Sequence, residues 1–297
     1  YRPFDIRRFF NHQSVVWRPR TEVMAQLGSD RNVALITSRM TKGEDFAHAF
    51  VSRSPVEVIS LSSKTSNNAF VFPLFSSKMG DLHTAGGPRL NVSERLLSRI
   101  RSAEGGSNND SDERYNELTG GRLLDYVYAV LYSPGFRCRY QELLRIEFPR
   151  VPILLDGSLF QKLSVLGREL KELHLLESQP KCRPSTEPVG DSPFQVDKVS
   201  YSDGTVWIDK ANTRGFKGVP EEVWNFRIGG YQVCEKWLKD RQAKGGKNPR
   251  PGRVLTDEDI EHYQKIVVAL SETIRIMAEI DEVIEAHGGW PGAFQTG

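Results

Sequence analysis

The chain has 297 residues, a formal net charge of +2 and 38% hydrophobic residues. This composition excludes a disordered chain and allows one large or two ordinary domains with a hydrophobic core. No apolar run approaches the roughly 18 residues that a membrane helix needs, and no secretion leader opens the chain. Three widely spaced cysteines fit neither a disulfide framework nor a zinc site. We therefore expect a cytoplasmic protein with no membrane partner.

Charge is distributed unevenly along the chain. Residues 1–101 hold 15 Lys and Arg against 8 Asp and Glu, and residues 191–253 hold 12 against 8, whereas residues 254–297 hold 2 against 9. Two basic regions far apart in sequence form one positive face if the fold brings them together. Ordinary surface solvation explains the same numbers, and the pI of 8.4 is below the value of about 9 typical of nucleic-acid-binding domains. Charge alone leaves nucleic-acid binding open.

The basic first part, residues 1–101, predicts mainly strands. Short β-rich runs separated by polar or turn residues lie at 14–17, 32–37, 46–51, 56–61 and 69–75. A short helix is expected over 93–101, where apolar residues recur at helical spacing. Residues 102–121 contain almost nothing to bury and predict a flexible connector.

Helical periodicity dominates residues 122–176. Apolar residues at 123–131 share one face, a second helix is expected over 140–148, and a third over 158–176 places leucines at three- and four-residue steps. Four prolines in residues 177–193 then predict a second connector.

Residues 194–297 predict a hairpin, a strand and two helices. Asp203-Gly204 is a hairpin turn between strands at 196–201 and 205–209. Alternating apolar residues predict a strand at 223–228, whose aromatic side chains we expect in the core, followed by a helix over 231–242. Thr256 with Asp259 forms a capping-box pattern that opens a long helix ending near residue 287. The whole is an α+β fold: strand-rich, then helical, then a hairpin–strand–helix unit with a long C-terminal helix.

Catalytic patterns fail when tested against this sequence. No phosphate-binding GxxxxGK[ST] is present, and the six histidines show no metal-binding spacing. Asp156, Glu169 and Lys171 have the composition of a magnesium-dependent nuclease, but the last two lie in a helical pattern and point about 200° apart. The polar-Pro-Pro-aromatic loop expected for adenine methylation is absent as well. We expect no catalytic residue, no metal and no cofactor in this chain.

Two loops have the composition of base-reading segments, because Arg, Lys, Asn and Gln make the hydrogen bonds that distinguish base edges. The base-reading candidates are Lys64, Asn67, Asn68, Asn212, Arg214 and Lys217. Other basic residues, including those of a run at 241–253 with five Lys and Arg and no acid, are candidates for phosphate contacts: Arg18, Arg20, Arg39, Lys42, Lys244, Lys247, Arg250 and Arg253. Solvated loops and, for the basic run, a disordered linker are the alternatives.

Several blocks of sequence resemble one protein family. They are YRPFDIR at 1–7, DYVYAVLYSP at 125–134, FPRVP at 148–152, VWNFRIGGYQV at 223–233 and KWLK at 236–239. Together they resemble the C-terminal specificity domain of single-chain Type ISP restriction–modification enzymes and related adenine-N6 DNA methyltransferases. Their apolar character marks them as scaffold, so they do not identify base-contacting residues.

The resemblance implies a target-recognition domain for double-stranded DNA. It implies an upstream methyltransferase domain that uses S-adenosylmethionine, together with the helicase and nuclease domains of such enzymes, all outside this chain. Phe9 or Phe10 would lie at the seam with the methyltransferase and is a candidate for stacking near an extruded base. Two alternatives stay open: a structural coupler between methyltransferase and motor domains that does not read bases, and a catalytic methyltransferase fragment.

Overall fold

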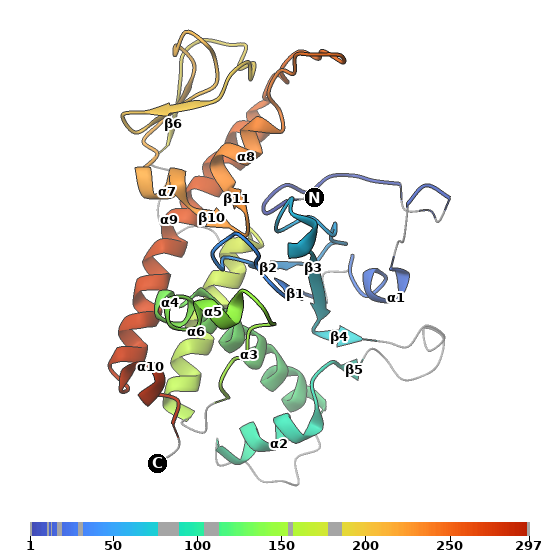
Figure 1. Cartoon of the computed structure of the whole chain (residues 1–297), viewed down its shortest axis with the longest axis vertical. Coiled ribbons are helices and arrows are strands. Elements are labelled where there is room, and N and C mark those ends of the chain that lie inside the picture. Colours follow the sequence, from blue (N-terminus) through green and yellow to red (C-terminus); the bar gives the residue numbers. More distant parts are fainter. Residues whose placement is uncertain are drawn as a thin grey trace.

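The computed structural model describes residues 2–10, 12, 14–16, 20–28, 32–76, 89–103, 113–153, 157–177 and 186–295. Figure 1 shows their arrangement. The helices are α1 (Thr21–Met24), α2 (Glu94–Ala103), α3 (Glu113–Tyr132), α4 (Pro134–Arg139), α5 (Gln141–Leu144), α6 (Gly157–His174), α7 (Glu221–Asn225), α8 (Val233–Lys239), α9 (Asp257–Glu285), α10 (Gly289–Gly292) and the 3-10 turn η1 (Thr65–Asn67). The strands are β1 (Ala34–Ser38), β2 (Ala49–Ser52), β3 (Ala69–Pro73), β4 (Phe75–Ser76), β5 (Arg89–Leu90), β6 (Glu187–Val189), β7 (Ser200–Ser202), β8 (Thr205–Trp207), β9 (Gly215–Lys217), β10 (Arg227–Ile228) and β11 (Tyr231–Gln232).

A three-stranded antiparallel sheet in the order β2-β1-β3 lies at the centre of the molecule. Successive residues of a strand point to opposite faces, and here both faces are covered. Ala49 and Val51 pack into a helical core, whereas Ile36 and Phe50 pack into a second core built by the C-terminal part of the chain. The sheet is therefore shared between two hydrophobic cores.

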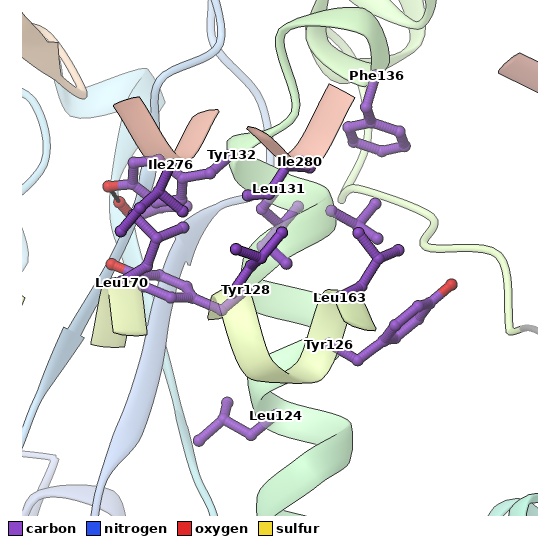
Figure 2. Packing of buried hydrophobic residues seen from close by; sticks show 14 of the residues in the cluster. Leu124, Tyr126, Tyr128, Leu131, Tyr132, Phe136, Leu163, Leu170, Ile276 and Ile280 are labelled. Atoms are coloured by element: carbon purple, nitrogen blue, oxygen red, sulfur yellow. Dashed lines mark hydrogen bonds between the residues drawn. The ribbon is translucent and has the colours of Figure 1, made fainter. Parts of the chain in front are cut away.

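The helical core is built by α3 and α6, with α4 and the second half of α9 packed on them. Figure 2 shows its tyrosines, leucines and isoleucines interdigitating. Gly167 lets α6 approach α3 closely, because a Cβ at this position would lie 1.8 Å from the Asp125 carbonyl oxygen. The heptad-like leucines of 158–176 thus form the expected buried face, and this prediction is confirmed.

The second core joins a four-stranded antiparallel sheet, in the order β6-β9-β8-β7, to α7, α8 and the first half of α9. The predicted hairpin turn is present: Asp203 and Gly204 adopt positive φ angles of 50° and 71° between β7 and β8. Trp224 and Trp237 are buried here, as we expect for core aromatics. In Figure 1 this sheet lies at the top of the molecule, at the opposite end from α2.

Helix α9 has 29 residues and spans both cores. It begins at the predicted capping box, in which the Thr256 hydroxyl accepts from the Asp259 N–H and the Asp259 carboxylate accepts from the Thr256 N–H. Residues 263–270 contribute to the second core, and Ile276, Ile280 and Ile284 contribute to the helical core. One helix therefore fixes the position of each core relative to the other.

His174 lies where the two cores meet. Its Nε2 is 2.9 Å from the Thr273 hydroxyl, which itself donates to the Ala269 carbonyl oxygen. His174 must therefore donate from Nε2, and its Nδ1 accepts from the Tyr128 hydroxyl. The ring stacks on Phe50 and meets Phe4 edge-on. Burial, with a smaller contribution from the Arg137 charge, lowers the pKa of His174 to about 3, so the imidazole is neutral in the folded protein.

Several sequence predictions of local structure are wrong. Residues 14–16 form a turn, with the Val15 and Val16 N–H groups donating to His12, and residues 56–61 run as turns without a partner strand. The first predicted connector is helical from Glu113 onward, since Thr119 and Gly120 are buried and Gly120 lies against Leu90. The helical part of the connector has a contact with a distant segment, β5, which local composition does not contain.

Three further boundaries differ from prediction. The segment 223–228 is helical at its start, where Val223 and Trp224 are buried in α7, and only Arg227–Ile228 form a strand, β10. Of the helix predicted over 140–148, only the short α5 is present, and Tyr140 separates it from α4. Part of the second predicted connector forms β6.

Because unfolded His174 accepts a proton near pH 6.5 and the folded form does not, acid should destabilise the chain. We expect the free energy of unfolding to fall by about 1.4 kcal/mol per pH unit from this group between pH 6 and 4. The replacement His174→Gln should lower stability at pH 7 and flatten that slope by about one proton. Urea unfolding across this pH range measures both. The exposed His12→Gln is the control, and an unchanged slope in His174→Gln would refute the assignment.

Candidate nucleic-acid interface

The basic run at 241–253 forms an ordered hairpin, not a disordered linker. Lys244 and Arg250 make an antiparallel bridge through two backbone hydrogen bonds of 2.9 Å, which closes a loop over residues 244–250. The base of the loop is fixed to the core: the Ala243 N–H donates to Val196, and the Val196 N–H donates to Arg253. Gly252 allows this contact, since a Cβ there would lie 1.9 Å from the Val196 carbonyl oxygen. We call residues 244–250 the basic hairpin.

The side chains of the basic hairpin are exposed and cationic. Lys244, Lys247 and Arg250 all face solvent, and no carboxylate lies within the hairpin itself. Lys244 and Lys247 have no ion pair in the described part of the chain, and Arg250 donates to the backbone oxygen of Asp240. Arg253, at the base, is instead held by Asp259 at 2.8 Å. Within the described residues, the positive charge without a carboxylate partner thus lies in the basic hairpin and not at Arg253.

A second basic loop connects β8 to β9, and Asp209 shapes it. The buried Asp209 carboxylate accepts hydrogen bonds from the Thr213 N–H, the Thr213 hydroxyl and the Arg214 N–H. Burial by itself would raise the pKa of Asp209, but these hydrogen bonds and the Arg214 charge lower it, so the carboxylate is ionised. Asn212, in this turn, and Lys217, on β9, remain exposed.

Arg214 is occupied by structural contacts. Its Nη1 donates to the Pro193 carbonyl oxygen at 2.7 Å and its Nε lies 3.5 Å from Asp209. Pro193 begins the segment that anchors the basic hairpin at Val196. The β8–β9 turn and the basic hairpin therefore share one backbone support, although 30 residues of sequence separate Arg214 from Lys244.

The loop at 62–68 is organised by Glu44. This carboxylate accepts from the Asn67 side-chain amide at 2.7 Å, from the Ser62 hydroxyl at 2.9 Å and from His48 at 3.0 Å. Burial would raise the pKa of Glu44, but the hydrogen bonds from Asn67 and Ser62, together with His48, lower it. The Lys64 ammonium group donates to the Gly43 carbonyl oxygen and lies 3.7 Å from the same carboxylate.

Asn67 is therefore not a surface residue: its exposed fraction is 0%. Its amide holds the loop together, so this geometry corrects the prediction that it faces a base. The neighbouring Asn68 is half-buried, and Arg39 and Lys42, in the adjacent loop after β1, are exposed. Arg20 is exposed before α1, and Arg18 lies outside the described residues.

The N-terminal segment joins the two basic regions. Asp5 is buried between Arg241, at 3.0 Å, and Arg7, at 2.8 Å. Burial would raise the pKa of Asp5, and the two guanidinium groups more than offset it, so the net pKa is lowered. Tyr231 also donates its hydroxyl to the Ile59 carbonyl oxygen. Segments of 1–75 and 212–253 thus lie in contact, as a shared binding face requires.

Three exposed polar residues near these loops escaped the sequence analysis: Lys198, Lys210 and Asn248. Lys198 lies beside the β8–β9 turn because its N–H donates to Ile208. Asn248 lies in the basic hairpin, and the composition of that run was the signal that could have identified it. No cluster of His, Cys, Asp or Glu in the described ranges could hold a metal ion. Nor does any helix there have the length and apolarity to cross a membrane.

The sequence matches the family model of the Type ISP C-terminal specificity domain over residues 1–279. The chain belongs to this family. No curated protein matches it. Within the family assignment, the shared blocks of sequence have the expected role: residues 126–132 and 223–238 supply many of the buried side chains of the two cores.

Three solved structures share the fold of this Type ISP specificity domain. A nuclease-deletion mutant of the Type ISP restriction–modification enzyme LlaGI, in complex with a DNA substrate mimic, aligns with a TM-score of 0.66 over 94% of this chain and 24% of that chain. The DrdV–DNA complex, solved by cryo-electron microscopy, aligns with a TM-score of 0.70 over 94% of this chain and 28% of that chain. The ATP-dependent Type ISP restriction–modification enzyme LlaBIII bound to DNA aligns with a TM-score of 0.68 over 95% of this chain and 18% of that chain. Each is 19% identical to this chain.

These relatives are much longer than the fold described here. The chain spans between 18% and 28% of their length. At 19% identity the likeness is one of fold, so it places no individual DNA contact on this chain.

We expect Asn67→Ala to lower the free energy of unfolding by about 1–3 kcal/mol, because it removes a buried hydrogen bond to a carboxylate. Asn68→Ala, one residue away and half-buried, should change stability by less than about 0.5 kcal/mol. Urea unfolding of the two variants provides the comparison. Full stability of Asn67→Ala combined with a changed DNA preference would return Asn67 to the base-reading set.

Proposed function

We propose that this chain recognises a specific sequence in double-stranded DNA, as the target-recognition domain of a restriction–modification enzyme. Methyl transfer to an adenine N6 would occur in a domain outside these residues, which would bind S-adenosylmethionine. The family match over residues 1–279 carries the proposal. The DNA-bound state of the three structures with this fold supports it, and the cytoplasm is the compartment in which such an enzyme would meet DNA.

The distribution of charge supports a division between phosphate contacts and base reading. Exposed Lys and Arg without carboxylate partners bind the phosphate backbone, since each releases condensed counterions. The basic hairpin has this character. Base reading needs side chains with directional donors and acceptors. Of the earlier candidates only Asn67 is buried: Lys64, Asn212 and Lys217 are exposed, and Asn68 and Arg214 are half-buried. Lys64 and Arg214 also make the structural contacts described above. Phe9 and Phe10 are also exposed, so they remain candidates for stacking on a base.

The proposal is tested by binding of the 297-residue chain to duplex DNA. A random duplex pool should yield one preferred sequence, and affinity for it should fall steeply with salt concentration. Binding without sequence preference would favour the alternative of a structural coupler. Binding of S-adenosylmethionine by the chain alone would favour a methyltransferase fragment.

If the basic hairpin contacts phosphates, Lys244→Gln/Lys247→Gln/Arg250→Gln should weaken binding to all duplexes and lower the slope of log affinity against log salt by about 2–3. The matched control is Arg89→Gln/Arg95→Gln/Arg99→Gln, three exposed arginines on β5 and α2 at the other end of the molecule. Measuring the affinity of both triple variants at four or more salt concentrations gives the two slopes to compare. An equal loss of slope in both triple variants would argue against a localised phosphate site.

If Asn212 reads a base, Asn212→Ala should cost about 1–3 kcal/mol of discrimination at one position of the site and little elsewhere. Affinities for duplexes that each carry one base change in the selected sequence would show this. Thr213→Ser, in the same turn, serves as the control, because serine keeps the hydroxyl that donates a hydrogen bond to Asp209. Uniform weakening in Asn212→Ala would instead make it a backbone contact.

A further inference from the structure

Strand β3 and the segment around α5 carry exposed apolar side chains that neither core covers. Phe70 and Phe72 on β3 are 42% and 44% exposed, and Leu143 and Ile146 are 58% and 62% exposed. Phe148 meets both β3 rings edge-on, with centroids 5.0 Å from Phe70 and 5.8 Å from Phe72. We call these five side chains the aromatic patch. Exposed apolar side chains gathered in this way mark interaction surfaces.

The backbone beside the patch is poorly suited to adding another strand. β3 is an edge strand of the central sheet. However, its first residue, Ala69, donates its N–H to the Val58 carbonyl oxygen, and its last residue is Pro73, which has no N–H. Recognition at this edge would therefore use the side chains of the aromatic patch.

The charges near the patch are paired, unlike those of the basic hairpin. Arg145 lies 2.8 Å from Glu142 and 3.4 Å from Asp45, and Arg150 pairs with Glu147. The carboxylates are exposed and would repel phosphate groups. An apolar centre with a rim of polar, charge-balanced side chains is the anatomy of a protein–protein interface. This charge pattern favours a protein partner over DNA.

The size of the patch indicates what kind of protein partner it suits. A stable interface between independent proteins involves about 20–30 residues on each side, and the apolar centre here has five side chains, of which Phe148 is half-buried. A partner on the same polypeptide needs far less contact, because the tether supplies an effective concentration in the millimolar range. In the DNA-bound relatives this fold makes up 18–28% of a much longer chain. We propose that the aromatic patch docks against another domain of the same Type ISP polypeptide.

Hydrogen–deuterium exchange tests the docking in the full-length enzyme that carries this chain. Residues 69–73 and 141–148 should exchange more slowly in the full-length enzyme than in the 297-residue chain. Phe70→Ser/Phe72→Ser should abolish the difference, raising exchange in the full-length protein by at least about tenfold. Leu143→Ser/Ile146→Ser, on the other segment, should do the same.

Val165→Ser is the matched control, since Val165 is 59% exposed on α6 and lies outside the patch. It should leave exchange at the patch unchanged. Equal exchange in the full-length enzyme and the isolated chain would overturn the proposal. Protection of the isolated chain by added duplex would make the patch a DNA contact, and protection that grows with chain concentration would make it a self-association surface. Either result would also overturn it.

Discussion

The arrangement of the molecule depends on a neutral histidine buried between two hydrophobic cores. His174 at the end of α6 binds Tyr128 of α3 and Thr273 of α9, and its ring packs on Phe50 of the central sheet. A charged imidazole would lose much of its hydration here and would interact unfavourably with the Arg137 charge. Because the contact needs all these elements in one place, the parts of the chain cannot shift independently without breaking it.

Titratable groups also hold the surface loops in place, but here they are ionised carboxylates. Asp209 holds the β8–β9 turn, Glu44 holds the loop at 62–68, and Asp5 binds Arg241 across the two basic regions. In each case burial opposes ionisation, and hydrogen bonds or arginines reverse the effect. Residues next to these anchors, such as Asn212 and Asn68, keep their side chains outside that network. A rigid loop with polar side chains outside its structural anchors can bind a ligand at a lower entropic cost than a mobile one.

Elements that carry their own start signal or a long periodic face were predictable from sequence. The capping box at Thr256 and the leucines of α6 gave helices with nearly the right bounds, and Asp203-Gly204 gave the turn. Elements defined by distant contacts were not. Glu113–Gly120 is helical, and β5 packs on its end through Leu90 and Gly120, a contact that no local pattern contains. Composition likewise located the polar loops but could not distinguish Asn67, which points inward, from Asn68.

The basic hairpin and the aromatic patch differ in whether their charges are paired, more than in how many charges they carry. Arginines beside the aromatic patch are balanced by Asp45, Glu142 and Glu147, whereas the lysines of the basic hairpin are unbalanced. In the part of the chain that the structure describes, the acidic helix α9 pairs with only one arginine of the basic run. Its first-turn Asp259 captures Arg253 at the base of the hairpin and also caps the helix. This contact pairs the charge of Arg253. Within the described residues, the positive charge of the run without a carboxylate partner lies on the exposed Lys244, Lys247 and Arg250, where a phosphate backbone can reach it.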